Sequence, residues 1–430
     1  MTDAILSRPV MSLLLSAGTS LLLRALGPAS AFALTLLLAR QLGAENTGYF
    51  FLSMTLITAL AMVARCGLDT ALQRLVGQAG GCPHRLAGIG RRAWQTVLLL
   101  ALPLTGLCWL TAPLIAGALL QNADLAGLVR LQGLMILPLA LLSVHAALLK
   151  ALEYPALGTA LEVTAWPALT LLLLLVLPVA GELTGLAGLY LLAVCLAAAI
   201  SARLVARRLP ATRQVTALPW RTLWQRALPL AGVDLMNFAL LWLPFLLLPL
   251  LANAAEAGVY NVSHRLAALP GLLMPVCAAI TSVRFARYWQ QGNTAALSRL
   301  AGHSTRLMTL LALPPVLLML GLPGPLLGLF GEEFVAGAGP LAVLALGQLG
   351  LLALGPAGYL LAMSGHEKQL RNLTLITTLL SLPLCLWLLP AFGAWGAAWV
   401  VTLTRLGNAL LCARLVRRRL PLPGWLLLAR

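Results

Sequence analysis

The sequence has few charged residues, and this scarcity excludes a soluble globular protein. Only 10% of its 430 residues are charged, whereas 60% are hydrophobic, and the mean hydropathy is +0.93. Soluble domains carry about 25% charged residues. Water is therefore not the main solvent of this chain, and we expect a membrane protein.

Acidic residues are especially scarce. The chain has 12 Asp and Glu residues against 29 Lys and Arg residues, which gives a net charge of +17. Such an excess could indicate nucleic-acid binding, but nearly all of these cations lie in short segments between apolar runs. That position indicates membrane topology, so no nucleic-acid partner is expected.

Motifs for metal binding and catalysis are also missing. The seven cysteines are dispersed, and we interpret them as reduced packing residues because none shows paired metal-ligand spacing. Cys82 and His84 form an isolated pair that favours an ordinary loop over a metal site. No phosphate-binding loop, zinc-protease motif, nucleophile elbow or dinucleotide fingerprint is present, and the loops are too short for a catalytic domain. The sequence predicts no enzyme, no catalytic residue, no metal and no cofactor.

Long apolar runs fill most of the chain, and their lengths predict transmembrane helices. They approach the ~20 residues of a membrane-spanning helix, whereas a barrel would show short segments of alternating polarity. No small-residue cleavage site follows the first run, so we expect the first helix to be retained. Twelve spans are predicted, near residues 11–39, 48–66, 93–120, 126–149, 156–180, 184–204, 227–251, 257–283, 306–330, 337–362, 371–390 and 394–415.

The positive charges alternate between the two sides of these spans. Of the 29 Lys and Arg residues, 24 fall in loops on one side, Arg65 and Lys150 among them, and only Arg40 falls in the loops of the other side. The remaining four lie inside predicted spans. By the positive-inside rule, we expect a bacterial inner-membrane protein with both termini in the cytoplasm.

An internal repeat divides the chain into two similar halves. Ala44 and Gly48 have counterparts about 210 residues later, at Ala254 and Gly258. Because each half holds an even number of spans, the halves would be parallel repeats related by a pseudo-two-fold axis along the membrane normal. The predicted fold is an all-α polytopic membrane protein with the following parts: an N-terminal six-helix lobe over 1–205, a cytoplasmic linker over 206–226, a C-terminal six-helix lobe over 227–416 and a cytoplasmic tail over 417–430.

Four arginines lie inside predicted spans, namely Arg24, Arg130, Arg265 and Arg405. Each charge at mid-membrane costs about 2.5–3.5 kcal/mol, so these side chains should face a watery cavity or an anionic partner. Arg24, half-way along the first span, is the strongest candidate for substrate contact. Structural pairing or snorkelling to the interface is the alternative for each, and it is favoured for Arg130 near the end of its span.

Further polar residues accompany these arginines. Asn261 and His264 share one helical face with Arg265, at spacings of i, i+3 and i+4, and we expect this stripe to line the cavity. Two carboxylates, Asp234 and Glu162, are also embedded. They could carry a coupling ion, H+ or Na+, or pair with a nearby arginine.

Four cations against two carboxylates leave the expected cavity positive, which predicts an anionic substrate. Guanidinium groups bind phosphate with bidentate geometry, which would suit a lipid pyrophosphate. Composition alone does not choose between this group and another anion.

The N-terminal pattern carries a family resemblance. Ser16, Arg24 and Pro28 are followed by the segment Leu37 to Phe50, with the letters LLARQLGAENTGYF, and then by Gly67-Leu68-Asp69-Thr70-Ala71. This pattern resembles the polysaccharide transporter family of Wzx-type oligosaccharide flippases, in the multidrug/oligosaccharidyl-lipid/polysaccharide exporter superfamily. The resemblance is strongest over residues 12–75.

The resemblance implies two lobes that alternate between inward-open and outward-open states around a cationic cavity containing Arg24. It implies export of an undecaprenyl-pyrophosphate-linked oligosaccharide to the periplasmic leaflet, with membrane lipid, a polymerase and glycosyltransferases as partners. A cation-coupled multidrug antiporter is the alternative, supported by Asp234 and Glu162. A membrane glycan ligase or polymerase is a third reading.

Overall fold

The structure is a computed structural model that describes residues 3–79, 82–177, 182–209 and 218–419, and the side chains of these residues from Leu26 onward except 279, 280 and 283. The described chain is helical and contains no strand. In a bilayer the backbone must satisfy its own hydrogen bonds, and a helix does so within one segment. The helices are α1 (Asp3–Arg65), α2 (Leu68–Gln78), α3 (Pro83–Leu119), α4 (Ala126–Gly133), α5 (Ile136–Ala151), α6 (Pro155–Thr159), α7 (Trp166–Val176), α8 (Leu183–Arg208), α9 (Trp220–Leu251), α10 (Ala254–Ala267), α11 (Leu273–Gln290), α12 (Thr294–Gly321), α13 (Pro323–Gly328), α14 (Ala338–Ala353), α15 (Ala357–Met363) and α16 (Glu367–Arg419).

Nine segments of the described chain are long and apolar enough to cross a membrane. Two of them, Leu26–Gln78 and Glu367–Arg419, contain a bend and cover two predicted spans each. The predicted span 257–283 corresponds to α10 and α11, which are separated by the 3₁₀ turn η3 (Leu269–Leu272). Within the described residues, the predicted spans fall on helical segments, and a multi-pass helical membrane protein is confirmed. Residues 178–180 of the predicted span 156–180 lie outside the described residues, as do 210–217 of the predicted linker and 420–430 of the predicted tail.

Single glycines join the helices of the two bent segments. Gly43 interrupts α1 with φ 72°, and Gly393 interrupts α16 with φ 53°. Residues with a Cβ atom rarely adopt such positive φ angles, whereas glycine does so at little cost. Two consecutive spans thus follow each other without a loop at both positions.

Other spans are irregular rather than straight. A π-helical stretch, η2 (Ala160–Ala165), lies between α6 and α7, and Gly355-Pro356 separates α14 from α15. The remaining short elements are 3₁₀ turns, η1 (Ala123–Leu125) and η4 (Glu332–Gly337). Prolines and glycines explain most of these breaks, because proline removes a backbone donor and glycine relaxes the helix.

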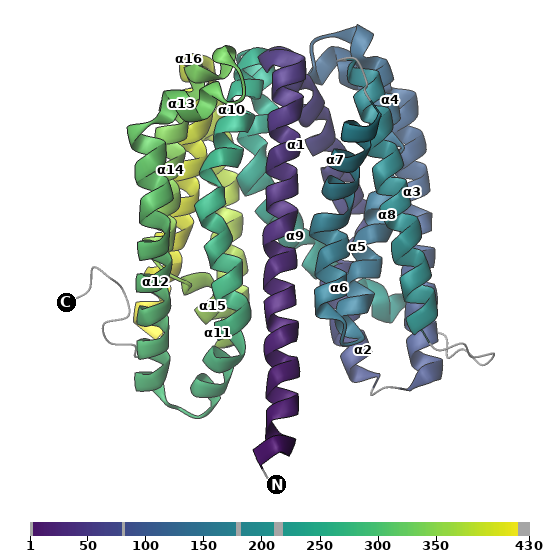
Figure 1. Cartoon of the computed structure of the whole chain (residues 1–430), viewed down its shortest axis with the longest axis vertical. Coiled ribbons are helices and arrows are strands. Elements are labelled where there is room, and N and C mark those ends of the chain that lie inside the picture. Colours follow the sequence, from purple (N-terminus) through teal and green to yellow (C-terminus); the bar gives the residue numbers. More distant parts are fainter. Residues whose placement is uncertain (1–2, 80–81, 178–181, 210–217, 420–430) are drawn as a thin grey trace. The chain divides into compact units, whose positions relative to one another are not determined.

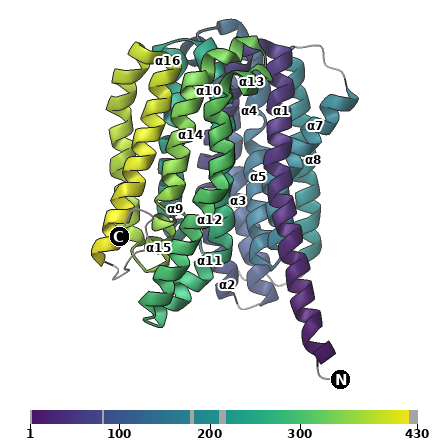
Figure 2. The same cartoon turned by 60° about the vertical axis from the view of Figure 1, so that its left-hand side comes forward.

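The chain divides into two compact units, residues 1–42 with 53–235 and residues 43–52 with 236–430. In the first unit, α5 packs against α2, α3 and α8 (Figure 1). In the second, α14 packs against α10, α12 and α16, and Figure 2 shows the green and yellow helices of that unit side by side. Leucines on outward faces are exposed, as at Leu110 (72%), which fits helices surrounded by lipid.

The segments that the internal repeat relates to each other also contact each other. A Cβ atom placed on Gly48 would lie 2.2 Å from the carbonyl oxygen of Ala254, and one on Gly258 would lie 1.9 Å from that of Ala44. Ala44 corresponds to Ala254, and Gly48 to Gly258, at the repeat distance of 210. The contact is therefore locally two-fold symmetric, which agrees with the predicted repeat.

Two glutamates cap the helices that begin after Gly43 and Gly393. A carboxylate oxygen of Glu333 accepts a 2.7 Å hydrogen bond from the Ala44 N–H, and one of Glu256 accepts a 2.7 Å bond from the Ala394 N–H. The first N–H groups of a helix have no partner in that helix, and a negative charge there also complements the helix dipole. These carboxylates therefore stabilise both bends.

Candidate functional site

Two members of the predicted polar stripe on α10, Asn261 and Arg265, pair with each other. The Arg265 Nε atom donates a 2.8 Å hydrogen bond to Oδ1 of Asn261. The Arg265 guanidinium also lies over the Phe51 ring, 4.1 Å from its centroid. Asn261 and His264 are buried in the second unit, and the lining of a substrate cavity by this stripe stays a prediction.

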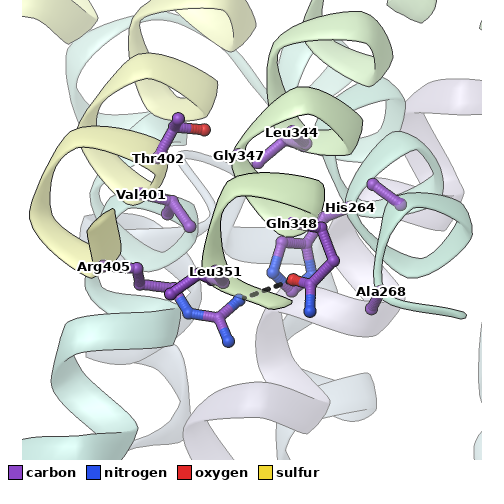
Figure 3. A pocket seen from close by; sticks show the side chains of 10 residues that line it. His264, Ala268, Leu344, Gly347, Gln348, Leu351, Val401, Thr402 and Arg405 are labelled. Carbon is purple, nitrogen blue, oxygen red and sulfur yellow. Dashed lines mark hydrogen bonds between the residues drawn. The ribbon is translucent and has the colours of Figure 1, made fainter. Parts of the chain in front are cut away.

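His264 lines a small pocket together with residues from α14 and α16. Figure 3 shows the Arg405 guanidinium beside the Gln348 side chain, with the His264 ring next to them. Arg405 Nη1 donates a 3.2 Å hydrogen bond to Oε1 of Gln348. The structure thus brings together His264 and Arg405, two residues that lie 141 positions apart and were predicted separately.

His264 also contacts aromatic rings that are not part of the pocket lining. The His264 ring stacks on Tyr260 with centroids 5.7 Å apart and lies 5.1 Å from Trp242 of α9. Tyr260 stacks in turn on Phe245 at 6.1 Å. This stack fixes the position of the imidazole ring without using its nitrogens.

Three buried polar atoms of α10 have no hydrogen-bond partner among the described residues. They are the Tyr260 hydroxyl, Nδ2 of Asn261 and Nδ1 of His264. An unpaired buried polar atom costs about 1–3 kcal/mol, so such atoms mark places where water or a ligand binds. The site therefore offers donor and acceptor capacity that the fold does not use.

Arg405 is held by an amide and not by a carboxylate. Its one hydrogen bond with a side chain in the described residues goes to Gln348, and no carboxylate there lies within salt-bridge distance. A guanidinium has five N–H donors, and Gln348 occupies one. A cation inside an apolar helix bundle without a fixed anion is costly, which favours binding of an anion from outside.

The pocket in its present shape is small. Its volume is about 20 Å³, which is room for roughly one water molecule. A phosphate group therefore cannot enter the pocket itself. The other guanidinium donors of Arg405 have no side-chain partner among the described residues.

The two other predicted arginines lie elsewhere. Arg130, near the end of α4, is exposed, and its guanidinium lies over the Trp109 ring at 5.1 Å. This placement agrees with an interfacial side chain and not with a buried site. Arg24 lies on α1, but its side chain is outside the described residues, so its role stays a prediction.

The first unit holds a second polar cluster, around Arg65 at the end of α1. Arg65 Nη1 lies 2.6 Å from Oδ2 of Asp69 and donates a 2.6 Å hydrogen bond to the Ser143 hydroxyl. That hydroxyl donates a 3.3 Å bond to the other Asp69 oxygen. The three side chains form a closed ring in which Arg65 and Asp69 are only 19% and 18% exposed.

Both predicted carboxylates belong to the first unit. Glu162, on the π-helical η2, accepts a hydrogen bond from Lys150 Nζ of α5. Its cationic partner is thus a lysine and not an arginine. Asp234 of α9 lies within electrostatic range of Arg65, and Asp69 within range of both Glu162 and Asp234. Three carboxylates therefore share this region with two cations.

Sequence reasoning missed Asp69, Ser143 and Gln348 as site residues. Gln348 is uncharged, and the search for site residues in the spans relied mainly on charge, so Gln348 was not distinguished from packing residues. Arg65 and Asp69 do have the i, i+4 spacing of a helical ion pair. The positive φ angles at Cys66 and Gly67 interrupt the helix between them, however, and the apolar pattern ends there.

The fold of the chain is found in solved structures of membrane transporters. It is similar to an inward-facing multidrug resistance MATE family transporter of the MOP superfamily, with a TM-score of 0.76 and 13% identity over 93% of this chain and 97% of that chain. It is similar to the lipid II flippase MurJ in an inward closed conformation, with a TM-score of 0.73 and 13% identity over 94% of this chain and 87% of that chain. A MOP superfamily transporter from Pyrococcus furiosus, described as having a binding pocket of reverse polarity, gives a TM-score of 0.68 and 14% identity over 94% of both chains.

The fold is therefore that of a multi-pass helical membrane protein. Residues 18–283 match the family described as "Polysaccharide biosynthesis protein". Since the match covers more than half of the 430 residues, the chain belongs to that family. No curated protein sequence matches it.

Proposed function

We propose that this protein is a flippase that moves an undecaprenyl-pyrophosphate-linked oligosaccharide from the cytoplasmic to the periplasmic leaflet of the bacterial inner membrane. Its route is alternating access, with both termini in the cytoplasm. A polymerase and glycosyltransferases of the same polymer pathway are its expected partners. The family match and the transporter fold support the class, and the chemistry of the second unit supports the substrate.

The observation that carries the substrate proposal is Arg405. It lies inside an apolar unit, donates to Gln348, and has no carboxylate partner among the described residues. A diphosphate group supplies the missing negative charge and several acceptor oxygens at once.

An exchange assay with the purified protein in liposomes tests this proposal. The probe is an undecaprenyl-pyrophosphate-linked oligosaccharide with a fluorescent label on its sugar, and a membrane-impermeant reductant quenches the label in the outer leaflet. We expect the quenched fraction to rise beyond that of protein-free liposomes. No exchange by protein that is inserted and folded would contradict the proposal.

The first unit gives one observation in favour of a different substrate class. Asp69, Glu162 and Asp234 outnumber Arg65 and Lys150 there, and a cation-coupled multidrug antiporter needs such carboxylates. Uptake of a fluorescent organic cation by the same liposomes under a proton or sodium gradient, without exchange of the labelled lipid, would favour this alternative. In a flippase, the same carboxylates would serve H+ or Na+ coupling.

A further inference from the structure

A second pocket lies in the first unit, on the side of the chain where the arginines are concentrated. It has a volume of about 260 Å³ and is formed by the end of α2, the start of α3 and the start of α9. Its lining residues are Leu75, Gln78, Ala79, Arg85, Ile89, Leu218, Pro219, Thr222 and Arg226. No acidic residue is among them.

The start of α9 is fixed onto α3 by Arg92. The Arg92 Nε atom donates a 3.0 Å hydrogen bond to the Leu218 carbonyl oxygen, and its guanidinium lies over the Trp220 ring at 4.7 Å. Leu223 of α9 is fully buried. The pocket walls are therefore held in place by contacts that do not use the two lining arginines, Arg85 and Arg226.

Those two arginines leave most of their donors available. Arg226 Nη1 donates to Oε1 of Gln78 at the end of α2, and both Arg85 and Arg226 are exposed. Each guanidinium offers five donors in a planar arrangement that matches phosphate oxygens. Both groups line the same pocket, where they can coordinate one phosphate together.

The other walls are apolar. Leu75 and Ile89 are buried, and Leu218 and Pro219 also line the pocket. Inorganic phosphate has no apolar group that could contact these walls. A phospholipid can contact them with its glycerol and the upper part of its acyl chains. The combination of cations and apolar walls thus selects a phosphate that is attached to lipid.

The depth of the pocket agrees with a headgroup. α9 has 32 residues, which is about 48 Å of helix, whereas the hydrocarbon core is about 30 Å thick. Arg226 lies about 38 Å from the far end of α9. Its side chain is therefore beyond the hydrocarbon region, where lipid phosphates lie.

We propose that the pocket between α2, α3 and α9 binds the phosphate group of an anionic phospholipid through Arg85 and Arg226. Basic pockets at this depth between membrane helices bind anionic headgroups in other membrane proteins. The inference does not depend on the transported substrate, because the α10–α14–α16 site lies in the other unit. It gives the start of α9 a lipid that stabilises its position on α2 and α3.

Native mass spectrometry of the purified full-length protein, released from detergent with added phosphatidylglycerol, tests this proposal. We expect one retained phosphatidylglycerol in the wild type and at least about a tenfold weaker retention in R85Q/R226Q, since each charge-assisted hydrogen bond contributes that much. R207Q is the matched control, because Arg207 is exposed at the end of α8 in the same unit and outside the pocket. It should retain the lipid as the wild type does.

Further measurements distinguish a lipid phosphate from inorganic phosphate and check that the variants are folded. Diacylglycerol with the same acyl chains should not be retained, and millimolar inorganic phosphate should not displace phosphatidylglycerol. The single variant R85Q, which leaves the Arg226–Gln78 bond intact, should already weaken retention without changing the melting temperature. Displacement by inorganic phosphate alone, equal losses in R207Q and R85Q, or full retention in R85Q/R226Q would each overturn the proposal.

Discussion

Gly48 and Gly258 lie at one helix crossing, where each glycine meets a backbone carbonyl of the other helix. The separations from a hypothetical Cβ atom, 2.2 and 1.9 Å, are shorter than any van der Waals contact. Because the two residues are equivalent in the internal repeat, the crossing contains two equivalent contacts, Gly48 with Ala254 and Gly258 with Ala44. This crossing explains why small residues occupy both positions.

Alanine at Gly258 should destabilise the protein. The added methyl group would push the second helix of α1 away from α10, and such overpacking costs about 1–3 kcal/mol. We expect a lower melting temperature in detergent for G258A and for G48A. The control is G106A on α3, where a Cβ atom meets nothing within 4 Å. G258A melting at the wild-type temperature would show that the crossing is loose.

Removal of the glutamate caps should weaken the two bends. E333A and E256A each delete the acceptor of the first helical N–H after Gly43 or Gly393, and loss of an N-terminal cap costs about 0.5–2 kcal/mol. The double variant should lose approximately the sum, because the caps do not share an acceptor. E332A is the matched control, since the adjacent Glu332 is exposed as Glu333 is but does not accept the Ala44 hydrogen bond. An equal decrease in melting temperature for E332A and E333A would contradict the capping role.

The ion pair between Arg65 and Asp69 should be stronger than a surface pair. Exposed pairs contribute about 0.2–1 kcal/mol, but these side chains are mostly buried and share the Ser143 hydroxyl. A double-mutant cycle with R65A, D69A and R65A/D69A should give a coupling free energy above about 1 kcal/mol. A coupling near zero would mean that the ring of three side chains does not act as a unit.

Transport should depend on Arg405. R405Q removes the charge and should lower the exchange rate of the labelled lipid at least about tenfold, whereas R405K keeps a charge without the planar fork and should be intermediate. R130Q is the control, because Arg130 is exposed over Trp109. An R405Q protein with wild-type exchange would remove Arg405 from the substrate site.

Arg24 is a separate test of the sequence-based prediction. R24A should abolish exchange while the protein still inserts and folds, and R24K should restore part of the rate, because it keeps the charge but not the bidentate geometry. Insertion is followed by membrane expression and melting temperature. Normal export by R24A would exclude a role in substrate binding.

The spans could be predicted from the sequence because membrane helices are defined by apolar length. The predicted span 184–204 corresponds to α8 (Leu183–Arg208), and the stripe of Asn261, His264 and Arg265 was visible from helical spacing alone. The bends inside spans were harder to predict. The π-helical stretch at Ala160–Ala165, for instance, has no proline or glycine of its own.

The partners of the site residues could not be predicted, because they come from distant parts of the chain. Arg405 and Gln348 are 57 residues apart, and Arg65 and Ser143 are 78 residues apart. Only the packing of the helices brings them together. Lys150 shows the same limit, since the charge count placed it in a loop while the fold pairs it with Glu162.

The bends at Gly43 and Gly393 also constrain how the length of the chain can change during evolution. With no loop between the joined helices, one inserted residue would rotate the following helix by about 100° and turn its polar face towards lipid. Insertions and deletions should therefore be rejected at these joints and accepted in the connections between α2 and α3 and between α8 and α9. Length variation among homologues should be concentrated on the arginine-rich side.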